Sequence, residues 1–159
     1  MKVLVVRAVE DARRTAVRLS RSGVQTIVSP VLSIRPLDSA EPDGDFHALV
    51  ATSAHAFAAP FADRFRNAPL FLVGERTADS ARAKGFETIA AIADSAANLI
   101  PIIRDKVPIG RRLLYLAGRD RKDELERALS ATHDLAVVEA YAAEPASTLN
   151  VDAVAALRV

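Results

Sequence analysis

The chain has 159 residues, of which 50% are hydrophobic and 26% are charged, and its formal net charge is +1. This apolar content and near-zero charge exclude an intrinsically disordered protein. No apolar run approaches the ~20 residues of a membrane-spanning helix, and the absence of cysteine excludes a disulfide scaffold. We therefore expect a cytoplasmic globular protein with neither a membrane nor a nucleic-acid partner, because the bulk charge shows no basic footprint.

Arginine supplies 17 of the 21 basic residues, because lysine occurs at four positions alone. The guanidinium group binds carboxylates and phosphates through two parallel hydrogen bonds, so the excess is compatible with an anionic ligand. A GC-rich genome produces the same bias. The composition leaves both explanations open.

The N-terminal part of the chain alternates between strand and helix patterns. The apolar run Lys2–Val6 is typical of a buried parallel strand. Apolar residues at helical spacing predict a helix over Asp11–Ser22 that ends at Gly23. A second strand is expected at Val24–Val28.

A connector is predicted next. Ser29–Leu37 alternates apolar residues between two prolines, and Asp38–Asp45 is polar and rich in turn residues. Proline cannot donate a backbone hydrogen bond within a sheet, so this stretch is expected to cross from one body of the protein to another.

A complete α/β domain is expected over residues 37–143. Its predicted strands are His47–Thr52, Leu70–Val73, Glu87–Ala91, Arg112–Ala117 and Leu135–Tyr141. Its predicted helices are Ala54–Phe65, Arg76–Lys84, Asp94–Lys106 and Asp120–Ala131. Five strands interleaved with four helices predict a flavodoxin-like parallel sheet with helices on both faces.

Residues 1–36 and 144–159 are left as parts of a second, discontinuous α/β domain. After a second extended crossing over Ala142–Thr148, Asn150 is expected to cap a helix that runs to Val159. The two crossings are predicted to form a two-stranded linker between two flavodoxin-like domains, the discontinuous one being incomplete. Its exposed apolar strand edges would favour self-association.

Three corners after strands are candidate binding sites, because ligands of open α/β sheets bind beyond the carboxyl ends of the strands. They are Thr52-Ser53-Ala54-His55, Val73-Gly74-Glu75-Arg76-Thr77-Ala78 and Ala117-Gly118-Arg119-Asp120-Arg121-Lys122. Ser53 and Thr77 are equally explained as helix caps, and the cations of the third corner as a solvated surface cluster. Tyr141 would face a cleft between domains or be a half-buried hinge aromatic.

Other catalytic classes find little support. His47, His55 and His133 lack metal-ligand spacing, so no metal site is predicted. Ser53 lacks the flanking glycines of a nucleophile elbow.

Six of these segments together resemble the uroporphyrinogen-III synthases. They are Val3–Ala8, Ser29–Ile34, Thr52–Ala54, Val73–Ala78, Leu114–Asp120 and Val138–Tyr141. The resemblance implies a cofactor-free lyase of heme biosynthesis that cyclises hydroxymethylbilane, a linear tetrapyrrole, to uroporphyrinogen III with inversion of the last ring and loss of water. It implies Tyr141 as the catalytic residue, and as substrate-binding residues Arg7, Ser53, Ala54, Gly74, Thr77, Ala78 and Arg119.

The family also implies a longer chain. Three further strand–helix units would add about 80–90 residues beyond Val159. The sequence therefore leaves two hypotheses: a uroporphyrinogen-III synthase whose activity as a 159-residue chain is doubtful, or a non-catalytic α/β binding module of the same descent.

Overall fold

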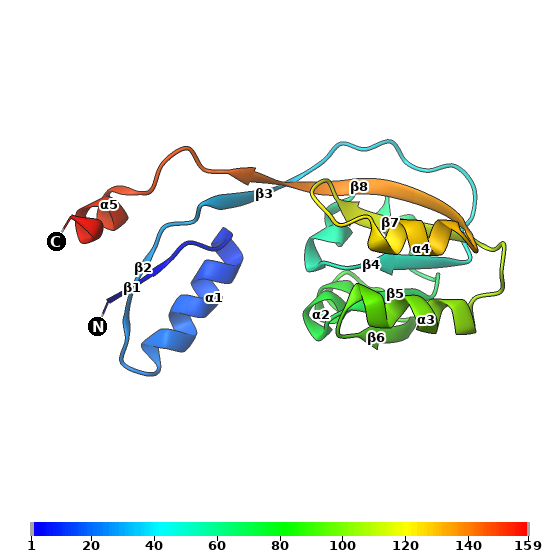
Figure 1. Ribbon diagram of the computed structural model, residues 1–159, viewed down its shortest axis with the longest axis horizontal. Helices are drawn as coiled ribbons and strands as arrows, with labels where there is room; N and C mark the ends of the chain where they lie inside the picture. Colours follow the sequence, from blue (N-terminus) through cyan, green and yellow to red (C-terminus); the bar gives the residue numbers. More distant parts are fainter. Residues whose placement is uncertain (1, 159) are drawn as a thin grey trace. The chain divides into compact units, whose positions relative to one another are not determined.

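The chain forms two compact units, and the computed structural model describes residues 2–158. The first unit consists of Met1–Arg35 and Ala143–Val159, and the second of Pro36–Ala142. The chain therefore enters the second unit at Pro36 and returns to the first at Ala143 (Figure 1).

The first unit contains a parallel strand pair. β1 (Lys2–Val5) pairs with β2 (Gln25–Val28), and helix α1 (Val9–Ser20) connects them. Helix α5 (Val151–Leu157) begins at Asn150, whose Oδ1 accepts a hydrogen bond from the Ala153 N–H at 2.9 Å. The predicted cap at Asn150 is confirmed.

Strand β3 (Leu32–Pro36) lies beside strand β8 (Asp134–Pro145) in the sheet. One backbone hydrogen bond joins the two segments near each end of β3. The Leu37 N–H donates to the Ala140 carbonyl at 3.0 Å, and the Ala146 N–H donates to the Val31 carbonyl at 2.8 Å. Val31 is bonded to Ala146 and the later residue Leu37 to the earlier residue Ala140, so the two segments run antiparallel. β8 thus continues as one strand through the stretch where a separate crossing was predicted.

The second unit is built on parallel strands β4 (Ala48–Ala51), β5 (Leu70–Val73), β6 (Ile89–Ala93), β7 (Arg112–Gly118) and β8. They lie in the order β8-β7-β4-β5-β6. The predicted α/β class with parallel sheets is confirmed. Counted from β4, the order is the doubly wound pattern 3-2-1-4-5, whereas flavodoxin itself follows 2-1-3-4-5. The winding reverses between β4 and β7.

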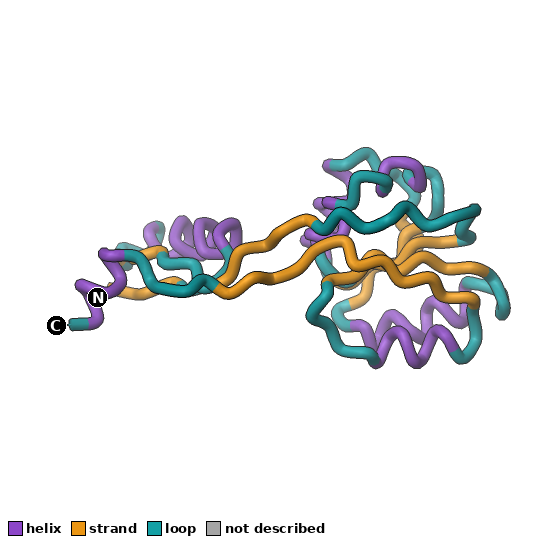
Figure 2. The backbone as a smooth tube through the Cα atoms, turned by 90° about the horizontal axis from the view of Figure 1, so that it is seen from above, coloured by secondary structure: helices purple, strands orange, loops and turns teal. Residues whose placement is uncertain are grey.

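Helices cover both faces of this sheet (Figure 2). η1 (Ala54–Ala58), η2 (Ala62–Phe65) and α2 (Glu75–Ala83) pack on one face, and α3 (Ala96–Lys106) and α4 (Glu124–Ser130) pack on the other. Alternate strand residues serve the two cores: Leu49 belongs to the first and Val50 to the second. No helix within residues 2–158 has the length and apolarity needed to cross a membrane.

The predicted single helix over residues 54–65 is wrong: this stretch forms the two short 3₁₀ helices η1 and η2. Proline lacks an N–H and disfavours helical backbone at the residue before it. Ala59, which precedes Pro60, accordingly has φ −60° and ψ 129°, and the helix breaks there.

The helix predicted from Asp120 begins instead at Glu124. The Arg121 guanidinium donates to the Gly118 carbonyl at 2.9 Å and to the Arg119 carbonyl at 3.3 Å. These bonds hold the residues after β7 in a tight turn, so the helix starts later.

Candidate active site

A pocket of about 230 Å³ lies in the second unit, where β4 and β7 end. Its walls include Thr52, Tyr115, Gly118, Arg121, Lys122 and Tyr141. Thr52 follows β4, Tyr115 and Gly118 belong to β7, and Tyr141 belongs to β8. The pocket therefore lies at the point where the winding of the sheet reverses. Ligands of doubly wound sheets bind at this position.

Two hydroxyl groups meet at the wall of this pocket. Tyr115 on β7 is only 2% exposed, and its phenol oxygen lies 3.1 Å from Oγ1 of Thr52. Burial raises the pKa of Tyr115 above its ordinary value, although the hydrogen bond with Thr52 opposes the shift. Tyr115 is therefore a neutral hydrogen-bonding group at physiological pH.

Tyr141 contributes a second phenol from β8. Its ring centroid lies 5.6 Å from that of His55 on η1, and the phenol end lies against Gly118. The half-buried ring also packs on the core between the sheet and η1 and α2. Tyr141 thus lies where β7, β8 and η1 meet, inside the second unit.

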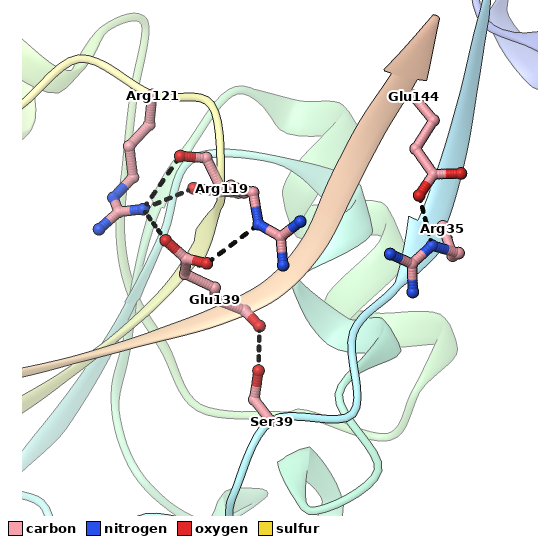
Figure 3. Close-up of polar contacts among 7 residues, drawn as sticks. Arg35, Ser39, Arg119, Arg121, Glu139 and Glu144 are labelled. Carbon is pink, nitrogen blue, oxygen red and sulfur yellow. Dashed lines mark hydrogen bonds and ion pairs between the residues drawn. The ribbon is translucent and has the colours of Figure 1, made fainter. Parts of the chain in front are cut away.

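The charged corner after β7 forms an ion-pair network (Figure 3). Arg121 pairs with Glu126 and lies 3.1 Å from Oε1 of Glu139, while Nε of Arg119 lies 3.3 Å from Oε2 of the same carboxylate. The hydrogen bonds that Arg121 donates to Glu126 and to Glu139 raise the pKa of Arg121. Hydrogen bonds from Arg121 and then Arg119 lower the pKa of Glu139.

Two cations of this corner, Arg119 and Arg121, thus form ion pairs within the protein. Arg119 keeps 52% of its side chain exposed despite its bond to Glu139. Exposed Lys122 has no ion pair among the described residues, and it borders the pocket. Positive charge is therefore available to an anionic ligand from Arg119 and Lys122.

The corner after β4 behaves as a helix cap. Oγ of Ser53 accepts a hydrogen bond from the His55 N–H at 3.3 Å, so the predicted cap is confirmed. The carbonyl of Ala54 accepts a bond at 3.0 Å from the Ser80 hydroxyl on α2. These contacts fix η1, and with it the His55 ring beside Tyr141.

The corner after β5 differs from its prediction in one respect. Gly74 precedes α2 with φ +82°, and a Cβ placed there would meet nothing within 4 Å. Glycine adopts this conformation without strain and leaves its backbone open to approach. Thr77 is not the cap of α2, because Gly74 holds that position; Thr77 lies in the first turn and is 4% exposed. Ala78 beside it is fully buried.

The structure gathers most of the predicted site residues along the carboxyl edge of this sheet. Tyr141 and Arg119 accompany β7 and β8, Ser53 and Ala54 follow β4, and Gly74 and Thr77 follow β5. Arg7 belongs to the first unit, where it lies 3.5 Å from Asp11.

Sequence reasoning assigned no role to Tyr115 or Glu139, and it named Thr52 and Lys122 only as members of the candidate corners. The available signal for Tyr115 was a hydroxyl in the middle of the apolar strand Leu113–Ala117. Within residues 2–158, no three His, Asp or Glu side chains come together in a way that could hold a metal ion.

Comparison with known proteins identifies the family. A family model described as uroporphyrinogen-III synthase HemD matches residues 13–159. No curated protein matches the sequence significantly.

Two solved structures show the same fold. Uroporphyrinogen-III synthetase from Helicobacter pylori is 18% identical with a TM-score of 0.56, over 84% of this chain and 62% of that one. A mutant uroporphyrinogen III synthase from Thermus thermophilus is 14% identical with a TM-score of 0.59, over 89% of this chain and 64% of that one. The matched region is thus less than two thirds of either solved chain. Because the family model covers nearly all of the sequence, the chain belongs to the uroporphyrinogen-III synthase HemD family.

Proposed function

We propose that this protein acts as a uroporphyrinogen-III synthase, cyclising hydroxymethylbilane to uroporphyrinogen III with inversion of the last pyrrole ring and loss of water. The observation that carries the proposal is the pocket at the reversal point of the sheet, with the Tyr141 phenol in its wall. Family membership supports the same assignment. The proposed reaction uses no metal or organic cofactor.

Recognition of the substrate is assigned to cations and to open backbone at the sheet edge. Each pyrrole ring of hydroxymethylbilane carries an acetate and a propionate group, and guanidinium and ammonium groups bind such carboxylates. Arg119 is half exposed, Lys122 is exposed beside the pocket, and Gly74 presents uncovered backbone. Ser53, Ala54, Thr77, Ala78 and Arg7 keep their proposed substrate-binding roles by motif position. For Thr77 and Ala78 the backbone is the better candidate, because both side chains are buried.

The chemical step needs a proton at the leaving hydroxyl group. In our proposal the Tyr141 O–H donates to that oxygen, the carbon–oxygen bond breaks, and water leaves. The carbon of the last ring that already carries the bridging methylene attacks the resulting cation, and its bond to that bridge then breaks. The freed bridge carbon bonds to the unsubstituted α-carbon of the same ring, which inverts the ring, and the proton that this α-carbon releases balances the one used to form water. Much of the remaining rate enhancement would come from holding the flexible chain with its reacting ends together.

The test is an isomer-resolved assay with hydroxymethylbilane. We expect isomer III from the wild-type chain, and a loss of rate of about 10²-fold in Tyr141→Phe, the size typical of a lost general acid. Tyr115→Phe is the matched comparison, because it removes the other phenol of the same pocket.

Three outcomes would contradict parts of the proposal. Only isomer I from folded wild-type protein would refute the synthase activity. A large loss of rate in Tyr115→Phe with none in Tyr141→Phe would transfer the acid role to Tyr115. Saturable binding of the substrate without turnover would favour a binding module.

A further inference from the structure

Gly118, the last residue of β7, occupies a position where the structure has no room for a side chain. A Cβ at Gly118 would lie 2.7 Å from Cζ, 2.8 Å from the phenol oxygen and 3.0 Å from Cε2 of Tyr141. Gly118 is not among the glycines with positive φ. An added Cβ would therefore displace the Tyr141 ring, and the close packing at Gly118 does not come from an unusual backbone conformation.

The pairing of β7 with β8 shifts at the same point. Ala117 is paired with Glu139, and the next residue, Gly118, is paired with Tyr141, so β8 carries Ala140 as an extra residue. Consecutive residues of a regular strand point to opposite faces, and a bulge changes this alternation. Ala140 and Tyr141 accordingly pack on the same core cluster. The shift brings the Tyr141 ring against Gly118.

Two further contacts hold Tyr141. The Arg119 N–H donates to the Tyr141 carbonyl at 2.9 Å, which fixes the backbone beside the ring. The His55 ring packs on Tyr141 at an interplanar angle of 59°. The ring is thereby held between β7 and η1 while it lines the pocket.

We propose that Gly118 is a positioning residue for Tyr141, because its lack of a side chain lets the phenol end of the ring lie against β7 and face the pocket. The catalytic consequence rests on the proposed function. The position of the Tyr141 ring against Gly118 does not depend on the proposed function. The structural role of Gly118 and its catalytic consequence can therefore be tested separately.

The first test follows the Tyr141 ring by NMR in the Gly118→Ala variant. The chain has two tyrosines and no tryptophan, so ring-labelled tyrosine gives signals from Tyr115 and Tyr141 alone, and Tyr115→Phe assigns them. We expect Gly118→Ala to shift the Tyr141 signals. Gly110→Ala is the control for general destabilisation, because it adds a methyl group at φ +81°, where a side chain is strained, but with nothing within 4 Å. It should leave the Tyr141 signals in place.

The second test asks whether the two residues are coupled in stability. Gly118→Ala should lower the midpoint of urea unfolding in the wild-type background. It should lower it much less in a Tyr141→Ala background, where the opposing ring is absent. Unshifted Tyr141 signals, or an equal loss in both backgrounds, would overturn the proposal.

The isomer assay provides the catalytic readout. We expect Gly118→Ala to lower kcat by about 10-fold or more with little change in KM, because displacement of a reacting group affects the chemical step. A shifted Tyr141 ring with kcat unchanged would refute the catalytic part. Wild-type protein that forms no isomer III, with the NMR shift and the stability coupling both present, would refute the proposed function. The role of Gly118 in positioning the Tyr141 ring would then be retained.

Discussion

Tyr115 is a polar residue within the apolar run Leu113–Ala117 of β7. Leu114 and Leu116 beside it are buried, and the phenol oxygen reaches Thr52, 63 positions away in sequence. A buried hydroxyl without a partner costs free energy, whereas a paired one is tolerated. Thr52 thus allows a phenol to form part of the pocket wall.

The hydroxyl groups of Tyr115 and Thr52 should be coupled in their effect on stability. We expect Tyr115→Phe or Thr52→Val alone to reduce the free energy of unfolding by ~1 kcal/mol, because the remaining hydroxyl loses its partner. The double variant should cost less than the sum of the two. Urea unfolding of the four proteins measures the difference, and strict additivity would show that the hydroxyl pair contributes nothing.

At the scale of elements, Glu139 connects β8 to the turn after β7. Its carboxylate accepts hydrogen bonds from Arg121 and Arg119, and its carbonyl accepts one from the Ser39 hydroxyl (Figure 3). Arg35 and Glu144 form a separate pair between β3 and β8, 2.6 Å apart. Ion pairs therefore join β8 to neighbouring segments in both units: Glu139 in the second unit and Glu144 in the first.

The Glu139 network predicts a loss of stability in acid. The pKa of Glu139 lies below its ordinary value of 4.5 in the folded protein. Its contribution is thus present above the pKa of the unfolded chain and is lost as pH falls through the folded pKa. The side chain is 40% exposed, so we expect at most ~1 kcal/mol.

Urea unfolding at pH 7 and at pH 3 tests this expectation. Between the two values the wild-type protein should lose more stability than Glu139→Gln. Glu87→Gln is the control, since no ion pair of Glu87 is found among the described residues. Its acid sensitivity should equal that of the wild type. The same wild-type behaviour in Glu139→Gln would remove the network as the cause.

At the scale of the whole molecule, the first unit offers uncovered apolar surface. Within the described residues, β1 and β2 pair with each other and with no third strand. An apolar cavity of about 330 Å³ is lined by Val3, Leu4, Ile27 and Leu157 among others, and Leu157 is 62% exposed. Unpaired strand edges and apolar patches favour association with a second chain.

We therefore predict concentration-dependent self-association of the 159-residue chain through the first unit. Leu157→Lys should weaken it by placing a charge on the apolar surface, as sedimentation velocity would show. Ile109→Lys is the matched control, because Ile109 is an exposed apolar residue of the second unit. A monomer at every concentration, or equal effects of both variants, would contradict the prediction.

Local patterns predicted most elements, and they failed where a proline or a side chain bonding the backbone interrupted a helical pattern. The apolar runs at Leu70–Val73 and Arg112–Ala117 became β5 and most of β7, because burial on both faces leaves a continuous apolar signal. The break at Pro60 could have been predicted from the residue itself. The late start of α4 could not, since it depends on the Arg121 side chain folding back onto the carbonyls of Gly118 and Arg119, a conformation that residue type alone does not specify.

The amino-acid sequence by itself determined the alternation of strands and helices, the three corners after strands and the family resemblance. These follow from local burial patterns and from residues adjacent in the chain. Only the tertiary structure decided that Tyr115 meets Thr52, that Gly118 lies against Tyr141, and that Glu139 pairs with two arginines. Such contacts depend on strand order and on a one-residue shift in register, and local periodicity carries no information about either.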